Sequence, residues 1–71
     1  MEEVFIIKRI GFPTIASVMY LEEMDNKYTN LPQHAMRFMH YNDAKNVIHS
    51  IMDAYLFDDV LFAVETYLVR E

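Results

Sequence analysis

The stretch NDAKNVIHSIMDAY, residues 42–55, carries the clearest periodic signal of the chain. Its apolar residues recur at the i, i+3, i+4, i+7, i+8 and i+11 spacing of a single helix face. These residues are Ala44, Val47, Ile48, Ile51, Met52 and Tyr55. Asn42 is expected to cap the helix, because its side-chain oxygen can accept an unpaired backbone N–H, and Asp43 suits the positive end of the helix dipole. We therefore predict one amphipathic helix from Asn42 to Tyr55.

The start of the chain reads as a strand. Residues 3–10 have the sequence EVFIIKRI, a run rich in the β-branched and aromatic types that favour strands. Gly11 and Pro13 follow this run and interrupt regular structure. We predict a first strand from Glu3 to Ile10 with a turn after it.

The next segment, Thr14–Glu23 (TIASVMYLEE), again mixes Ile, Val, Tyr and Thr. Because the connection to the first strand is short, antiparallel pairing of the two is the simplest arrangement. A helix over Thr14–Met24 is the alternative, with Pro13 in its first turn. Glu22 and Glu23 would then lie near the C-terminus of that helix, where negative charge opposes the dipole, and this counts against the helix.

The middle of the chain is more polar. Met24–Pro32 (MDNKYTNLP) contains the Asp, Asn and Pro residues that are typical of turns, so we predict the main loop there. A helical turn over Leu31–Ala35 is compatible with the sequence. Ala35–Tyr41 (AMRFMHY) then alternates with a period of two residues, which favours a short third strand.

Val60–Val69 (VLFAVETYLV) follows a turn signal and is dense in strand-forming residues. One face would carry Val60, Phe62, Val64, Thr66 and Leu68, and the other Leu61, Ala63, Glu65, Tyr67 and Val69. A strand with two apolar faces is usually central in its sheet or covered on its second side, and in a small chain the cover can be another subunit. The alternative is that Leu61, Tyr67 and Val69 are partly exposed.

These segments predict an α+β fold with a small antiparallel sheet of three to four strands packed on one amphipathic helix, in the order β-β-(β)-α-β. We expect residues 1–71 to form a single domain, because a chain of 71 residues leaves no room for a second. The hydrophobic fraction of 54%, with only one glycine and two prolines, argues against disorder.

Composition also bears on location. The chain has no cysteine, which fits a reducing compartment. No apolar run approaches the roughly 20 residues of a membrane span, and Glu2 and Glu3 are acidic where a signal peptide would be basic. We expect a cytoplasmic protein, outside the membrane.

The charge of the chain disfavours direct nucleic-acid binding. Eleven acidic and six basic residues give a net charge of −5, and the basic residues are scattered along the sequence. Nucleic-acid binding needs concentrated positive charge that displaces counterions from phosphates. The acidity permits a basic protein partner without requiring one.

The sequence contains no familiar motif of catalysis or metal binding. A single glycine, Gly11, cannot build a phosphate-binding loop or a nucleophile elbow. The spacings of His34, His40 and His49 match no familiar metal motif, even with Asp43 or Asp53 as a further ligand. We therefore expect a protein that is not an enzyme and that uses no cofactor or metal.

Aromatic and acidic residues give the best candidates for a contact with another protein, because aromatic side chains supply large buried area at interfaces. The tentative partner-binding residues are Tyr20, Glu22, Glu23, Phe57, Asp58 and Asp59. The acidic groups around Glu22 and Asp58 would form one negative surface if they meet in space. The simpler interpretation of these acids is a solvated face.

The order of the parts resembles small uncharacterised proteins encoded by bacteriophages and prophages of Gram-positive bacteria. The residues that carry the resemblance are Tyr28, Thr29, Ala35, Phe38, Asp43 and Ala44. It implies a fold and a phage or prophage origin in a host cytoplasm, and no activity. We expect a non-enzymatic interaction module that binds a host or phage protein of unknown identity, with self-association into a homodimer as part of that picture. The alternative is an acidic inhibitor that blocks the nucleic-acid-binding groove of a host defence enzyme.

Overall fold

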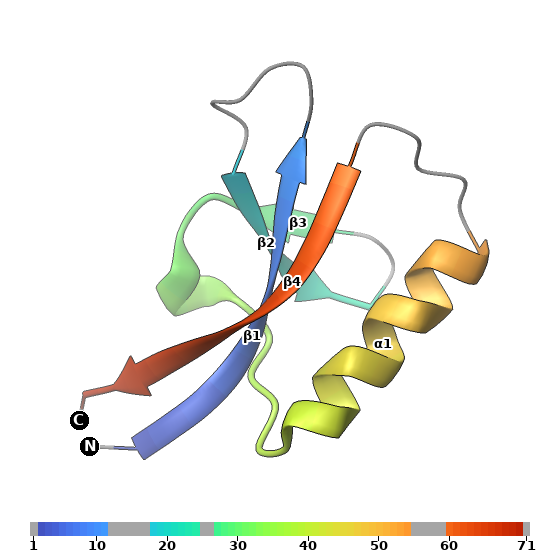
Figure 1. Ribbon diagram of the computed structural model, residues 1–71. Helices are drawn as coiled ribbons and strands as arrows, with labels where there is room; N and C mark the ends of the chain where they lie inside the picture. Colours follow the sequence, from blue (N-terminus) through green and yellow to red (C-terminus); the bar gives the residue numbers. More distant parts are fainter. Residues whose placement is uncertain (1, 12–17, 25–26, 55–59, 71) are drawn as a thin grey trace.

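The computed structural model is a four-stranded antiparallel sheet with a single α-helix against one face (Figure 1). The structure describes residues 2–11, 18–24, 27–54 and 60–70. The elements are β1 (Glu2–Gly11), β2 (Val18–Glu23), β3 (Lys27–Thr29), the 3-10 turn η1 (Pro32–His34), α1 (Tyr41–Ala54) and β4 (Val60–Val69). The strand order is β3-β2-β1-β4, so the predicted α+β class and the sheet on one helix are confirmed.

Strands β1 and β4 form the longest pairing of the sheet. They pair along their whole lengths, from Glu2 opposite Val69 to Gly11 opposite Val60. Both strands were predicted, and the structure confirms them. One of the alternatives for the last strand, a central position, is wrong, because β4 lies at the edge of the sheet and the strands with neighbours on both sides are β1 and β2. Strand order depends on long-range pairing, which the local sequence does not encode.

The hairpin interpretation of Thr14–Glu23 holds for the part that the structure describes. Val18–Glu23 is a strand that pairs antiparallel with β1, with Lys8 opposite Tyr20 and Ile10 opposite Val18. The alternative helix is therefore wrong for this segment.

A short strand replaces part of the predicted main loop. Lys27–Thr29 pairs antiparallel with β2, and Leu21 lies opposite Tyr28. The loop prediction for Met24–Pro32 is wrong here, because Tyr and Thr are good strand formers once a neighbouring strand supplies the hydrogen bonds.

The predicted third strand over Ala35–Tyr41 is also wrong. Only Phe38 forms an isolated bridge, with Phe5 of β1, while the N–H of Met36 donates to the carbonyl of Leu21 at 2.8 Å. Residues 36–38 thus bond to both β1 and β2 where these strands diverge. The helical turn expected just before them is confirmed as η1.

Helix α1 begins earlier than its sequence suggests. The carbonyl of His40 accepts hydrogen bonds from the N–H groups of Asp43 and Ala44, so the expected cap, Asn42, lies inside the first turn. The predicted apolar face is buried at Ala44, Ile48 and Ile51 and half-buried at Val47, whereas Met52 is 53% exposed. At 3.6 residues per turn, Met52 lies about 80° around the helix from Ala44, at the border of the apolar stripe. Tyr55 lies outside the described residues.

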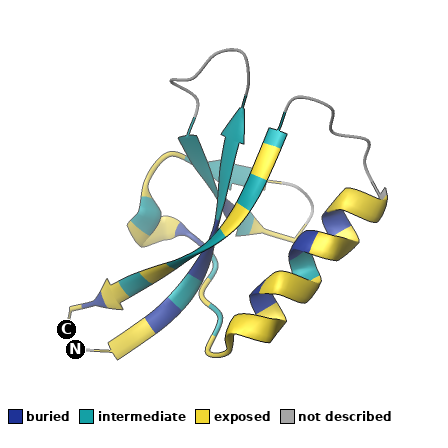
Figure 2. Cartoon of the chain, viewed as in Figure 1, coloured by how far each residue is buried: buried dark blue, intermediate teal, exposed yellow. Residues whose placement is uncertain are grey.

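The main core lies between α1 and the sheet. Its buried residues are Ile7, Leu21, Ala44, Ile48 and Ile51, and partly buried Phe5, Tyr28, Phe38, Val47, Phe62 and Val64 pack against them. Figure 2 shows α1 buried along the side that faces the sheet and exposed on the other. Among the described helices, none is long and apolar enough to cross a membrane.

Aromatic contacts border this core. The rings of Phe5 and Tyr41 meet edge to face with their centroids 6.0 Å apart, which ties the start of α1 to β1. The Arg9 guanidinium lies over the Tyr28 ring, 4.9 Å from its centroid. Both contacts belong to the side of the sheet that faces the helix.

Candidate protein-contact surface

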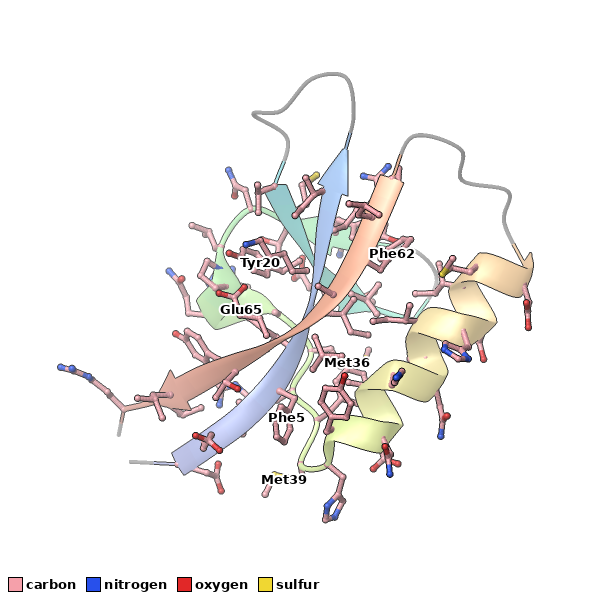
Figure 3. All side chains as sticks on the ribbon, viewed as in Figure 1. Phe5, Tyr20, Met36, Met39, Phe62 and Glu65 are labelled. Atoms are coloured by element: carbon pink, nitrogen blue, oxygen red, sulfur yellow. The ribbon has the colours of Figure 1, made fainter. Side chains whose placement is uncertain are left out.

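The sheet has one face that α1 does not cover, which we call the outer face. Ile7 and Leu21 point toward α1, since both belong to the core cluster that includes helix residues. Side chains alternate along a strand, so Ile6, Lys8 and Tyr20 point to the outer face. Figure 3 shows the same separation, with Tyr20 and Glu65 away from the helix and Phe62 toward it.

Directly opposed residues on neighbouring strands share a face, and this builds a patch across three strands. Ile10 lies opposite Val18 on one side and opposite Leu61 on the other. The next row is formed by Lys8, with Tyr20 and Ala63 as its two neighbours. We call these six residues, Val18, Ile10, Leu61, Tyr20, Lys8 and Ala63, the outer-face patch.

The patch is largely accessible. Leu61 is 58% exposed, Ala63 is exposed, and the other four members are half-buried. The opposite end of the outer face differs, because Val4 and Ile6 are both only 1% exposed and Val69 is 6% exposed. The outer face therefore combines a closed end near the termini with an open, mainly apolar end.

Carboxylates border the open end. Glu65 is the next residue after Ala63 on the same face and is half-buried, and its Oε2 atom is buried with no hydrogen-bond partner among the described residues. Glu22 is half-buried and lies two residues beyond Tyr20 on β2. Glu23 is exposed, and one of its carboxylate oxygens lies 3.6 Å from Lys27 Nζ.

The structure places three of the tentative partner-binding residues. Tyr20 belongs to the outer-face patch, whereas Glu22 and Glu23 lie at the end of β2 beside it. Phe57, Asp58 and Asp59 lie outside the described residues. Sequence reasoning missed Ile10, Val18 and Leu61 as a row, because only the register of three strands brings them together.

A shallow cavity lies elsewhere, beside the second half of α1. Its volume is about 240 Å³, and the described residues that line it are His49, Met52 and Asp53. This volume is below the range of about 300–1,000 Å³ typical of small-molecule sites. Across the described ranges, His, Asp and Glu side chains form no group of three that could hold a metal ion.

The fold and this surface define a small α+β domain with one open sheet face. A scan against protein-family models, a search of curated proteins and a search of solved structures each find no match to the chain.

Proposed function

We propose that this chain is a non-enzymatic protein-interaction module, encoded by a phage or prophage, that binds a host or phage protein through the outer-face patch. The observation that carries the proposal is the row formed by Val18, Ile10 and Leu61 on a sheet face that α1 leaves open. Accessible apolar surface with a polar border is typical of protein contact sites.

The chemistry of the patch indicates the kind of partner. Tyr20 offers an aromatic ring with a polar tip, a type enriched among residues that dominate binding energy. Glu22 and Glu65 flank the two rows, the second of which contains Lys8, and the chain carries a net charge of −5. A partner with an apolar spot surrounded by Lys or Arg side chains would complement this surface.

Affinity capture from a Gram-positive host lysate tests the proposal, with the wild-type chain compared to Tyr20→Lys. We expect one stoichiometric protein with the wild type and a loss of at least about tenfold with Tyr20→Lys, corresponding to about 1.4 kcal/mol. Leu31→Lys is the matched control, since Leu31 is 41% exposed and lies outside the patch. Equal capture by all three chains would remove the patch from the proposal, and capture of nothing by the wild type would remove the proposal itself.

A second candidate is an acidic inhibitor of a nucleic-acid-binding enzyme. Glu22 and Glu23 directly follow Leu21, and Asp53 follows Ile51 by two residues. Leu21 and Ile51 belong to one core cluster, but Glu22 alternates with Leu21 and lies on the outer face while Asp53 lies on α1. The acids that this function would use are therefore the adjacent Glu22 and Glu23 at the end of β2. Competition between the chain and DNA for the captured protein tests this function. It predicts loss of competition in a Glu22→Lys, Glu23→Lys double variant, whereas Tyr20→Lys would retain it.

A further inference from the structure

We propose that two copies of this chain pair through the outer edge of β4, in an antiparallel arrangement with Val64 on the two-fold axis. This self-pairing goes beyond the proposed function, because it uses the backbone edge of β4 and leaves the outer face of each copy open. The proposal begins from the direction of the backbone groups along this strand.

The hydrogen bonds of Phe5 fix that direction. Its N–H and carbonyl both bond to Phe38, on the side of β1 opposite to β4. Phe5 and Thr66 therefore form a pair without hydrogen bonds between them, and the N–H and carbonyl of Thr66 point away from β1. Because this direction alternates along a strand, the backbone groups of Val64 and Leu68 point to the same outer edge. In the described part of the chain, no backbone hydrogen bond reaches the outer groups of these three residues.

The sequence of β4 lacks the features that usually protect an edge. Val60–Val69 contains no Pro, no Gly and no Lys, and its single charged residue is Glu65. It is also ten residues long, whereas protected edge strands are commonly short or interrupted. The outer backbone groups of Val64, Thr66 and Leu68 can therefore accept another strand.

The occupant is identified by the way β4 complements itself. Leu61 and Leu68 are 58% and 52% exposed and lie near opposite ends of the strand. Antiparallel pairing with Val64 opposite Val64 of the second copy places Leu61 opposite Tyr67 and Leu68 opposite Val60. Each exposed leucine then gains an apolar neighbour on its own face.

Electrostatics selects this register over its closest competitor. The outward-pointing backbone groups belong to the even-numbered residues of β4. The two copies can therefore bond only in registers that place even-numbered residues opposite even-numbered residues. Two such registers give the longest overlap between the two strands. One pairs Val60–Leu68 of both copies and sets Glu65 opposite Ala63. The other pairs Leu61–Val69 and sets Glu65 directly opposite Glu65, where like charges are destabilising. In the favoured register the two Glu65 side chains are diagonal neighbours.

The test combines mass and amide exchange on the purified chain. The molecular mass from light scattering should rise with concentration and approach twice the chain mass of 8.5 kDa. Hydrogen exchange followed by NMR should show the amides of Val64, Thr66 and Leu68 becoming protected in step with that mass. A mass of one chain at every concentration, with these three amides unprotected, would overturn the proposal. Protection that develops only when a captured partner protein is added would assign the edge to that partner instead.

A proline variant makes the test specific for the edge. Thr66→Pro removes an outward N–H without removing a bond between β1 and β4, and it should hold the mass at that of one chain. Thr66→Val is the matched control and should dimerise like the wild type. A Thr66→Pro chain that is folded and still dimeric contradicts the proposal, and if this variant does not fold, the wild-type exchange pattern decides. Capture by the outer-face patch is measured separately, so failure of one proposal leaves the other intact.

Discussion

Phe5 and Phe38 exchange two backbone hydrogen bonds, each 2.8 Å between nitrogen and oxygen. This isolated bridge secures the connection before α1 against β1, in the space that β2 leaves as it diverges. Together with the bond from the N–H of Met36 to the carbonyl of Leu21, this bridge joins the segment before α1 to the hairpin of β1 and β2.

Replacing Phe38 by proline should test how much that bridge contributes to the free energy of unfolding. Phe38→Pro removes the N–H that Phe5 accepts, and Phe38→Ala removes the same ring while keeping the N–H. We expect the proline variant to be less stable than the alanine variant by about 1 kcal/mol, the net contribution of one hydrogen bond at the half-buried Phe5. Urea unfolding of both variants measures the difference. Equal stabilities would mean that water replaces the bond at no cost.

Leu21 is fully buried at the centre of the core, so its truncation should be severe. Leu21→Ala should lower the free energy of unfolding by about 2–5 kcal/mol. This is comparable to the roughly 3–5 kcal/mol that one core of this size supplies, so the variant should be largely unfolded. Thermal unfolding followed by circular dichroism checks this outcome. Met24→Ala, at a residue 56% exposed, is the control and should change stability by less than about 0.5 kcal/mol.

Replacement of Glu65 by an apolar residue should stabilise the folded chain, because its Oε2 atom is buried. An acceptor that is buried without a hydrogen bond costs folding free energy, and an apolar side chain of similar shape avoids that cost. We expect Glu65→Met to raise the free energy of unfolding by about 1 kcal/mol. The measurement is chemical denaturation at a concentration where the chain is monomeric, with Glu65→Gln as the polar control. A less stable Glu65→Met variant would reveal an ordered water or ion bound to the carboxylate.

The Glu23–Lys27 ion pair should contribute little to stability. The two side chains are 63% and 58% exposed, so water and salt screen their attraction. Glu23→Gln should change the free energy of unfolding by less than about 0.5 kcal/mol at moderate salt. Melting temperatures at low and high salt test this, with Glu22→Gln measured alongside. A large loss that disappears in salt would show that the attraction between Glu23 and Lys27 is stronger than the exposure of the pair suggests.

Much of the fold is predictable from local patterns, and the corrections share one physical cause. The helix follows from the spacing of Ala44, Ile48 and Ile51, because periodic burial against a sheet needs no knowledge of the partner strand. Strand β3 and the bridge at Phe38 escape prediction, because each depends on hydrogen bonds from a distant segment.

The candidate surface was predictable only in part. Tyr20 was singled out as an aromatic residue near acids, and the structure places it on the outer face. Leu61 was named as part of a second apolar face of its strand, and it is exposed, but its neighbour Ile10 gives no local signal because the two meet only through the β1–β4 register. The strand order, which also depends on long-range pairing, makes β4 an edge strand.

The pairing of Glu2 with Val69 places the start of β1 beside the end of β4, as Figure 1 shows. A load applied between the ends would therefore act on the terminal hydrogen bonds of β1 and β4 first, and would peel the two strands apart one rung at a time. Strands loaded in this way separate at lower force than strands sheared along their length, where many bonds must break together. We expect single-molecule stretching to open this domain at low force, and a high unfolding force would contradict that expectation. The mechanical unfolding force of this domain should therefore be low even if its thermal stability is high.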